Sequence, residues 1–86
     1  MDKISLKMHA PLQIEGVRAL ADAGAISHVR VVASAGGLTV EINKKFLVAT
    51  RLKQTRVFSK SDTLFGWLKE LGITRIDEVD LIGWKV

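Results

Sequence analysis

The chain has 86 residues, a formal net charge of +4 and a sequence pI near 9.8. It has no cysteine, which excludes disulfides and thiolate metal sites, and 48% hydrophobic against 26% charged residues excludes the composition of disordered chains. No window approaches the roughly 18 apolar residues of a membrane span, and no apolar run follows the first charges as in a secretory signal. We expect one folded domain in the reducing cytoplasm, without a membrane partner.

The first predicted element is an amphipathic helix that begins at Pro11 and ends at Gly24, since proline suits a first helical turn and glycine a helix C-terminus. Residues 1–10 have no clear periodicity and are expected to be a flexible lead-in, which leaves residues 11–86 as a single α+β domain. Apolar side chains at helical spacing form one face of this helix, which is expected to pack against a sheet. They are Ile14, Val17, Leu20 and Ala21.

Three segments rich in β-branched and alternating apolar residues are predicted to form an antiparallel meander. They are residues 28–33, 38–42 and 46–52, joined by turns at 34–37 and 43–45. Leu52 is assigned to the inner face of the third strand, and residues 56–58 can add a fourth strand. A three- or four-stranded antiparallel sheet follows from this pattern.

The second predicted helix has Ser61 as its N-cap and Gly72 as the glycine after its end, with leucines at helical spacing between them. The alternation of acidic and apolar residues over 78–82 predicts a short last strand at a sheet edge. Both helices are expected on one sheet face. The predicted core comprises Ile14, Val17, Leu20, Val29, Val31, Leu38, Val40, Ile42, Val48, Phe58, Leu64, Leu68 and Leu71.

No pattern in the sequence predicts catalysis, a metal site or a cofactor. The only histidines, His9 and His28, lack a nucleophile and a second base at a recognisable spacing. The acidic residues at 77, 78 and 80 are interpreted as a solvated edge, because no apolar pocket or accompanying histidine is evident. Gly36-Gly37 fits a hairpin turn and matches no phosphate-binding motif. We therefore expect a binding protein and not an enzyme.

The basic residues gather in one stretch: six lie between positions 44 and 60, with no acidic residue among them. On the uncovered face of the sheet such side chains could bind phosphates without reading base sequence, whether the DNA is single- or double-stranded. The competing interpretation is an ordinary solvated surface, since no aromatic residue is assigned to this face beside these charges. The predicted nucleic-acid-binding residues are Arg30, Lys44, Lys45, Arg51, Lys53, Arg56 and Lys60.

Two tryptophans have no assigned place in the predicted core. Trp67 falls off the leucine stripe of the second helix, and Trp84 lies in the tail. Exposed indoles often pack at an oligomer interface, so both are interface candidates, against the alternative that they pack within the monomer. A homodimer is the simplest closed assembly that would cover them.

One pattern runs through residues 55–64 and 67–73, which contain an Arg-x-Phe before a capped helix that ends Leu-Gly-Ile. Residues 12–20 before this segment and the acidic alternating strand after it belong to the same pattern. On this pattern the chain resembles small partition-associated proteins encoded on plasmids and integrative elements. The resemblance covers about residues 11–81 and implies an accessory protein of plasmid maintenance, encoded with a partition ATPase and a centromere-binding protein. It supplies no active-site residues. The order of strands and helix is also similar to Whirly-type single-stranded-DNA-binding regulators, in topology alone.

Two functional hypotheses follow from the sequence. The first is a nucleic-acid-binding accessory protein that uses the basic sheet face. The second is an adaptor that docks a partition ATPase or centromere-binding protein through the acidic tail and the tryptophans, without contacting DNA.

Overall fold

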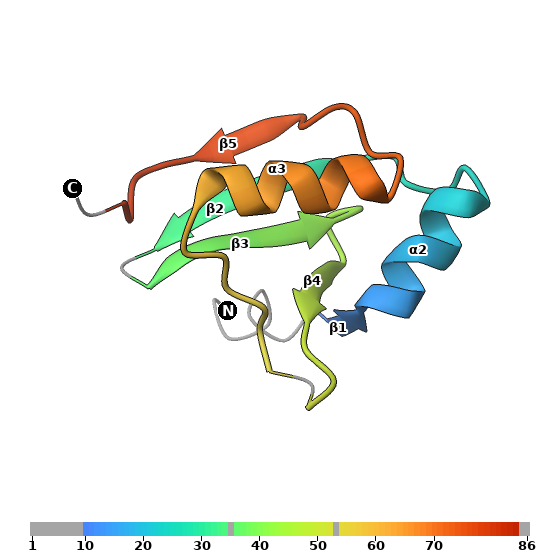
Figure 1. Cartoon of the computed structure of the whole chain (residues 1–86), viewed down its shortest axis with the longest axis horizontal. Coiled ribbons are helices and arrows are strands. Elements are labelled where there is room, and N and C mark those ends of the chain that lie inside the picture. Colours follow the sequence, from blue (N-terminus) through green and yellow to red (C-terminus); the bar gives the residue numbers. More distant parts are fainter. Residues whose placement is uncertain (1–9, 35, 53, 85–86) are drawn as a thin grey trace, which may run out of the picture.

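The computed structural model describes residues 10–34, 36–52 and 54–84. They form a five-stranded mixed sheet with two helices over one face (Figure 1). Neither helix in these ranges has the length and hydropathy that a membrane crossing requires. The elements in chain order are β1 (Ala10–Gln13), α2 (Ile14–Asp22), β2 (Val29–Ser34), β3 (Gly37–Ile42), β4 (Phe46–Ala49), α3 (Ser61–Glu70) and β5 (Glu78–Asp80).

The central strands β2, β3 and β4 form the predicted antiparallel meander. Val31 pairs with Val40 in the first hairpin, and Ile42 pairs with Phe46 in the second. The second turn places Asn43 and Lys44 at φ 56° and 60°, and the Lys45 N–H donates to the Ile42 carbonyl at 3.1 Å. The positive φ angles of these two residues suit the twist of the flanking strands, so this three-residue connection fixes the register of the hairpin.

Both edges of the sheet differ from the predicted antiparallel arrangement, because β1 and β5 pair in parallel with their neighbours. The strand order is β1-β4-β3-β2-β5, with β1 beside β4 and β5 beside β2. Pro11 lies in β1 and not in a first helical turn. Proline has no N–H to donate, and an edge strand is the place in a sheet that tolerates it. The short last strand is confirmed as an edge strand.

The predicted fourth strand at residues 56–58 is wrong. β4 ends at Ala49 and pairs with β3 only at its first two residues. The returning chain then makes two isolated bridges, one between Ala49 and Thr55 and one between Leu38 and Phe58. Leu52 lies outside β4 and is 81% exposed, so its assignment to the inner face is also wrong. The β4–α3 connection, residues 50–60, is therefore a loop pinned to the sheet at separate points.

One of these points depends on a glycine. The Leu38 N–H donates to the Phe58 carbonyl at 2.7 Å, and the Phe58 N–H donates to the Leu38 carbonyl at 2.8 Å. The preceding Gly37 has φ 137°, and a Cβ atom there would lie 2.5 Å from the Phe58 oxygen. No residue with a side chain fits this close approach without strain.

The helix ends agree with the sequence analysis more closely than the helix starts. Gly24 and Gly72 follow α2 and α3 with φ angles of 67° and 82°, as helix-ending glycines do. The first helix begins at Ile14, and the second has Lys60 as its N-cap, with Ser61 as the first helical residue. No side-chain hydrogen bond caps either N-terminus, so packing on the sheet has to hold both helices.

The core lies between the helices and the sheet. Every predicted core residue is buried except Leu20, which packs partly buried against the cluster, and Ile14, which is 37% exposed. Ile14 is the first residue of α2 and faces a surface groove instead of the interior. Ala33, Ala49 and Ile73 are additional buried residues that the periodicity did not single out.

Candidate nucleic-acid interface

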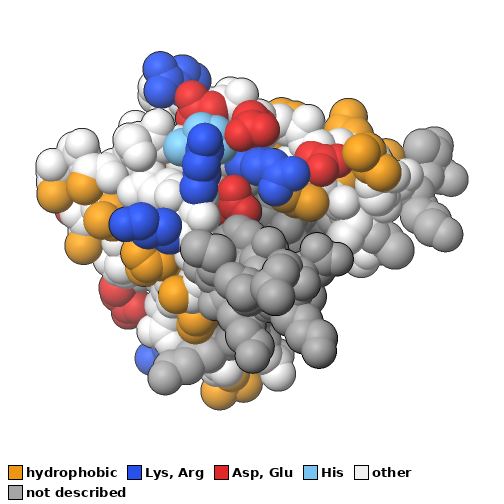
Figure 2. All heavy atoms as spheres, turned by 180° about the vertical axis from the view of Figure 1, so that it is seen from behind, with side chains coloured by type: hydrophobic (Ala, Val, Ile, Leu, Met, Phe, Trp, Pro, Cys, Tyr) orange, Lys and Arg blue, Asp and Glu red, His pale blue; other side chains and the backbone are white. Residues whose placement is uncertain are grey.

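The uncovered face of the sheet carries mixed charge (Figure 2). Arg30 on β2 reaches three carboxylates: its guanidinium nitrogens lie 3.0 Å from an Asp80 oxygen, 3.8 Å from Glu41 and 3.9 Å from Glu78. His28 Nε2 lies 2.7 Å from the other Glu78 oxygen. The expectation of a basic sheet face is wrong, because neighbouring strands bring acidic residues opposite Arg30.

Lys44 and Lys45 lie exposed at the β3–β4 turn. The Asn43 side chain holds this turn against the loop before β2: its Oδ1 accepts from the backbone N–H groups of Ser27 and His28 at 2.7 and 3.2 Å, and its Nδ2 donates to the Ala25 carbonyl at 2.9 Å. The two lysines therefore project from a fixed turn, separate from the other basic residues.

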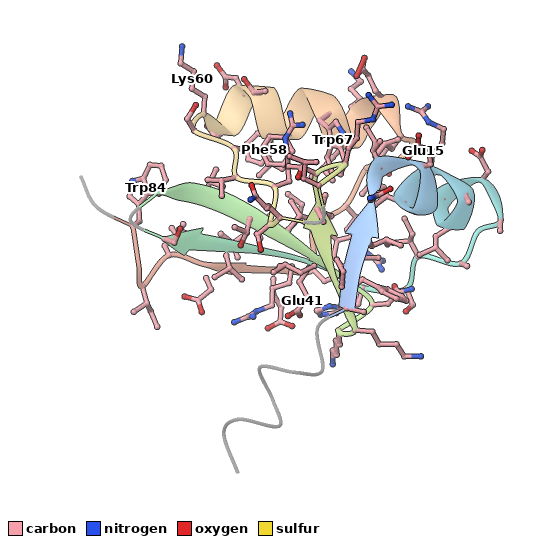
Figure 3. All side chains as sticks on the ribbon, turned by 90° about the horizontal axis from the view of Figure 1, so that it is seen from below. Glu15, Glu41, Phe58, Lys60, Trp67 and Trp84 are labelled. Carbon is pink, nitrogen blue, oxygen red and sulfur yellow. The ribbon has the colours of Figure 1, made fainter. Side chains whose placement is uncertain are left out.

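The other basic residues predicted to bind nucleic acid that the structure describes lie at two places on the helix side of the sheet. Lys60 lies exposed at the start of α3 and points away from the molecule (Figure 3). Arg51 and Arg56 lie in the β4–α3 connection and line one groove between α2 and α3. Lys53 falls outside the described residues. Of the predicted set, the structure brings Arg51 and Arg56 together.

This groove has a volume of about 500 Å³ and a mainly apolar lining. Its apolar residues come from three segments that are distant in sequence, namely α2, β4 with the loop after it, and α3, which is why no sequence pattern indicated the groove. We name it the Trp67 groove; it is lined by Gln13, Ile14, Glu15, Val48, Ala49, Thr50, Arg51, Leu52, Gln54, Arg56 and Trp67.

An aromatic pair supports the groove. The rings of Trp67 and Phe58 have centroids 5.3 Å apart at an interplanar angle of 47°, and the Arg56 guanidinium carbon lies 4.9 Å from the Phe58 centroid. Figure 3 shows both rings between the sheet and α3. Trp67 is partly buried against the core, so its predicted place on the exposed side of the helix is wrong. The helix thus adds a less buried aromatic ring, that of Trp67, to the buried Phe58 ring beside Arg56.

Backbone hydrogen bonds fix the wall that carries the two arginines. Gln13 Nε2 donates to the Arg51 carbonyl at 3.1 Å, and the Thr50 N–H donates to the Gln54 carbonyl at 2.7 Å. The Arg56 N–H donates to the Val48 carbonyl at 2.8 Å. Within the described ranges, neither Arg51 nor Arg56 forms an ion pair, in contrast to Arg30. Both guanidinium groups thus remain available to a ligand in a preformed groove.

Trp84, the second predicted interface residue, lies at the other end of the sheet and is 41% exposed (Figure 3). The backbone N–H of Trp84 donates to the Leu81 carbonyl at 2.9 Å. Gly83 beside it packs against β2, where an added Cβ would lie 2.6 Å from the Ala33 oxygen. The two tryptophans therefore belong to separate surfaces and do not form one patch.

A second titratable cluster lies near the start of β2. Asp77 accepts from the Val29 N–H at 2.8 Å, and its other oxygen lies 3.1 Å from Arg75 Nε. The Val29 hydrogen bond is the main cause that lowers the pKa of Asp77, with the charges of Arg75 and His28 adding to it against a smaller effect of burial. In the part of the chain that the structure describes, no three metal-ligating side chains come together.

Comparisons with protein-family models, curated proteins and solved structures gave no match.

Proposed function

We propose that the chain is a non-enzymatic accessory protein that binds single-stranded nucleic acid at the Trp67 groove. The observation that carries this proposal is the position of a partly buried indole in the same groove as two arginines, Arg51 and Arg56, that have no carboxylate partner in the described ranges. Stacking of a base on an aromatic ring contributes about 1 to 3 kcal/mol and tolerates any base sequence. The planar guanidinium group of arginine adds bidentate hydrogen bonds to phosphate.

The proposed ligand is single-stranded because the indole is reached from within a groove. A base inside a duplex presents only its edge, whereas an unpaired base can offer its face to Trp67. The helices do not suit the major groove, since both pack on the sheet and each has an acidic residue, Glu15 or Asp62, in its first turn. Lys44, Lys45 and Lys60 would contribute to the long-range attraction of a polyanion more than to local contacts.

The resemblance to partition-associated proteins makes plasmid DNA the expected source of this strand and plasmid maintenance the expected setting. The alternative hypothesis is an adaptor that docks a partition protein through the acidic tail and the tryptophans. Its acidic residues lie at the opposite edge of the sheet, whereas Trp67 belongs to the groove proposed for nucleic acid.

The test is a titration of a fluorescein-labelled oligothymidylate, single-stranded or annealed to its complement, at low and moderate salt. Tighter binding of the single strand is expected, with log K falling linearly against log salt. If each arginine neutralises one phosphate, the double variant Arg51→Gln/Arg56→Gln should reduce the slope by about 1.4, from about 0.7 per contact. The matched double variant Lys44→Gln/Lys60→Gln removes the same charge away from the groove and should change the slope less.

Stacking has its own readout. In a Trp84→Phe background, Trp67 is the sole indole, and its fluorescence should be quenched by the oligothymidylate. An affinity that does not change with salt, or equal effects of the two double variants, would contradict the proposed site.

A further inference from the structure

The outer edge of β5 is the second surface of interest. β5 is the last strand in the sheet order, and no strand in the described ranges pairs with its outer side. In its parallel register Glu78 lies beside Arg30 and Val79 beside the buried Val31. Side chains alternate along a strand, so Glu78 and Asp80 face the uncovered side of the sheet and Val79 faces the helix side.

The helix side of this edge is apolar. Val79 is 57% exposed, and Phe65 on the neighbouring helix α3 is 51% exposed. A groove of about 500 Å³ runs between α3 and the segment that leads into β5. In Figure 1, β5 lies at the margin of the sheet beyond β2, and α3 crosses in front of the sheet. The groove is lined by Phe65, Leu68, Lys69, Ile73, Thr74, Arg75 and Ile76.

The other side of the edge is acidic. The Glu78 side chain is 52% exposed and that of Asp80 29%, and these two carboxylates outnumber Arg30, the permanent cation that they share in the described ranges. The edge thus combines an unpaired backbone, an apolar groove on one side and surplus negative charge on the other.

We propose that the β5 edge binds an extended segment of a partner protein in which basic and apolar residues alternate. Such a segment would add a strand to the sheet through backbone hydrogen bonds. Its apolar side chains would enter the groove beside Phe65, and its basic side chains would lie next to Glu78 and Asp80. This site is independent of the Trp67 groove, which lies toward β1 and β4.

Charge favours this occupant over a second copy of the chain. Antiparallel pairing of two β5 strands about a two-fold axis at Val79 would place Glu78 of one copy opposite Asp80 of the other. Like charges directly opposite one another destabilise a strand pair.

The experiment uses the full chain labelled with ¹⁵N and three synthetic peptides. The first alternates lysine and valine, the second has the same composition with all lysines before all valines, and the third alternates glutamate and valine. The first should bind tightest and shift the amide resonances of β5 and of α3 around Phe65. Fluorescence anisotropy of the labelled peptides gives the affinities.

Variants separate the two sides of the edge. Glu78→Gln should weaken binding of the alternating lysine peptide about two- to fivefold, the usual range for one exposed charge pair. Phe65→Ala should weaken it about fivefold or more, as for a truncated interface anchor. The matched controls Glu15→Gln and Leu52→Ala, exposed residues at the other groove, should leave the affinity unchanged.

Equal affinity for the alternating and the block peptide, or amide shifts that avoid β5, would overturn the proposal. Sedimentation velocity adds a further check. A stable dimer whose β5 amides are already protected from hydrogen exchange without peptide would assign the edge to a second copy instead.

Discussion

Asp77 holds Val29 at both of its backbone polar groups. The Asp77 carboxylate accepts from the Val29 N–H at 2.8 Å, and the Asp77 N–H donates to the Val29 carbonyl at 2.8 Å. Val29 is the first residue of β2, and Asp77 precedes β5. This two-point contact sets the parallel register that brings Glu78 beside Arg30.

The contact predicts a loss of stability in acid. The folded-state pKa of Asp77 lies below its ordinary value of 3.8, mainly because the carboxylate accepts the Val29 N–H. Its contribution is therefore fully present above that value and is lost as pH falls through the folded-state pKa. The melting temperature of Asp77→Asn, followed by circular dichroism, should lie below that of the parent at neutral pH and approach it in acid. The control variant Arg75→Gln should still lose most of the stability that the parent loses in acid, because the Val29 hydrogen bond to Asp77 remains. If the melting temperatures of the parent and of Asp77→Asn fell in parallel with pH, Asp77 would not be the group responsible.

Packing of α3 on the sheet predicts a large cost for Leu68→Ala. Leu68 is 2% exposed within the core, and deletion of a buried leucine side chain costs about 2 to 5 kcal/mol. Leu52→Ala serves as the control, because Leu52 is 81% exposed and should cost under about 0.5 kcal/mol. Urea denaturation of both variants measures the difference. Similar losses for the two leucines would mean that α3 does not pack as described.

Two glycines predict opposite effects of the same substitution. Gly37→Ala should destabilise the fold by about 1 to 3 kcal/mol, since φ 137° and the nearby Phe58 oxygen exclude a Cβ atom. Gly66→Ala should stabilise it by up to about 1 kcal/mol, because Gly66 lies inside α3 with open space around it. Thermal unfolding of the two variants measures both effects, and a Gly37→Ala variant as stable as the parent would show that the Leu38–Phe58 bridge is not formed as described.

Substitution of Arg30 is expected to lower the stability of the fold without changing its affinity for nucleic acid. Arg30→Gln removes the cation that faces Glu41, Glu78 and Asp80, and should cost about 1.5 to 3 kcal/mol, the range for hydrogen bonds to charged groups. Affinity for oligothymidylate should change little, because Arg30 faces the other side of the sheet from the Trp67 groove. If this variant folds normally and loses the same salt slope as the Arg51/Arg56 double variant, the original hypothesis of a basic sheet face would be restored.

The sequence predicted the parts of the fold that follow from local periodicity. The meander, the two helices and their glycine ends all follow from spacing within about a dozen residues. The parallel edges were missed because pairing of β1 with β4, and of β5 with β2, is set by contacts between distant segments. A proline in an edge strand and a proline in a first helical turn look the same in sequence.

The candidate site was predicted only in part for the same reason. Proximity in sequence grouped the basic residues, but the sheet pairs Arg30 with acidic neighbours and the turn carries Lys44 away. Trp67 lines the same groove as Arg51 and Arg56, although it belongs to a helix that begins after them. Such a shared groove has no signature in the spacing of residues.

The parallel pairing of β5 with β2 also makes the charge network on the uncovered face a late product of folding. Arg30 and Asp80 meet across fifty positions of sequence, whereas the β2–β3 hairpin closes through a short turn. Closing a long loop costs more entropy than closing a short one, so the hairpin is expected to form before β5 joins the sheet. The hairpin already places Glu41 opposite Arg30, and the pairing of β5 then adds Glu78 and Asp80 to the carboxylates around this arginine.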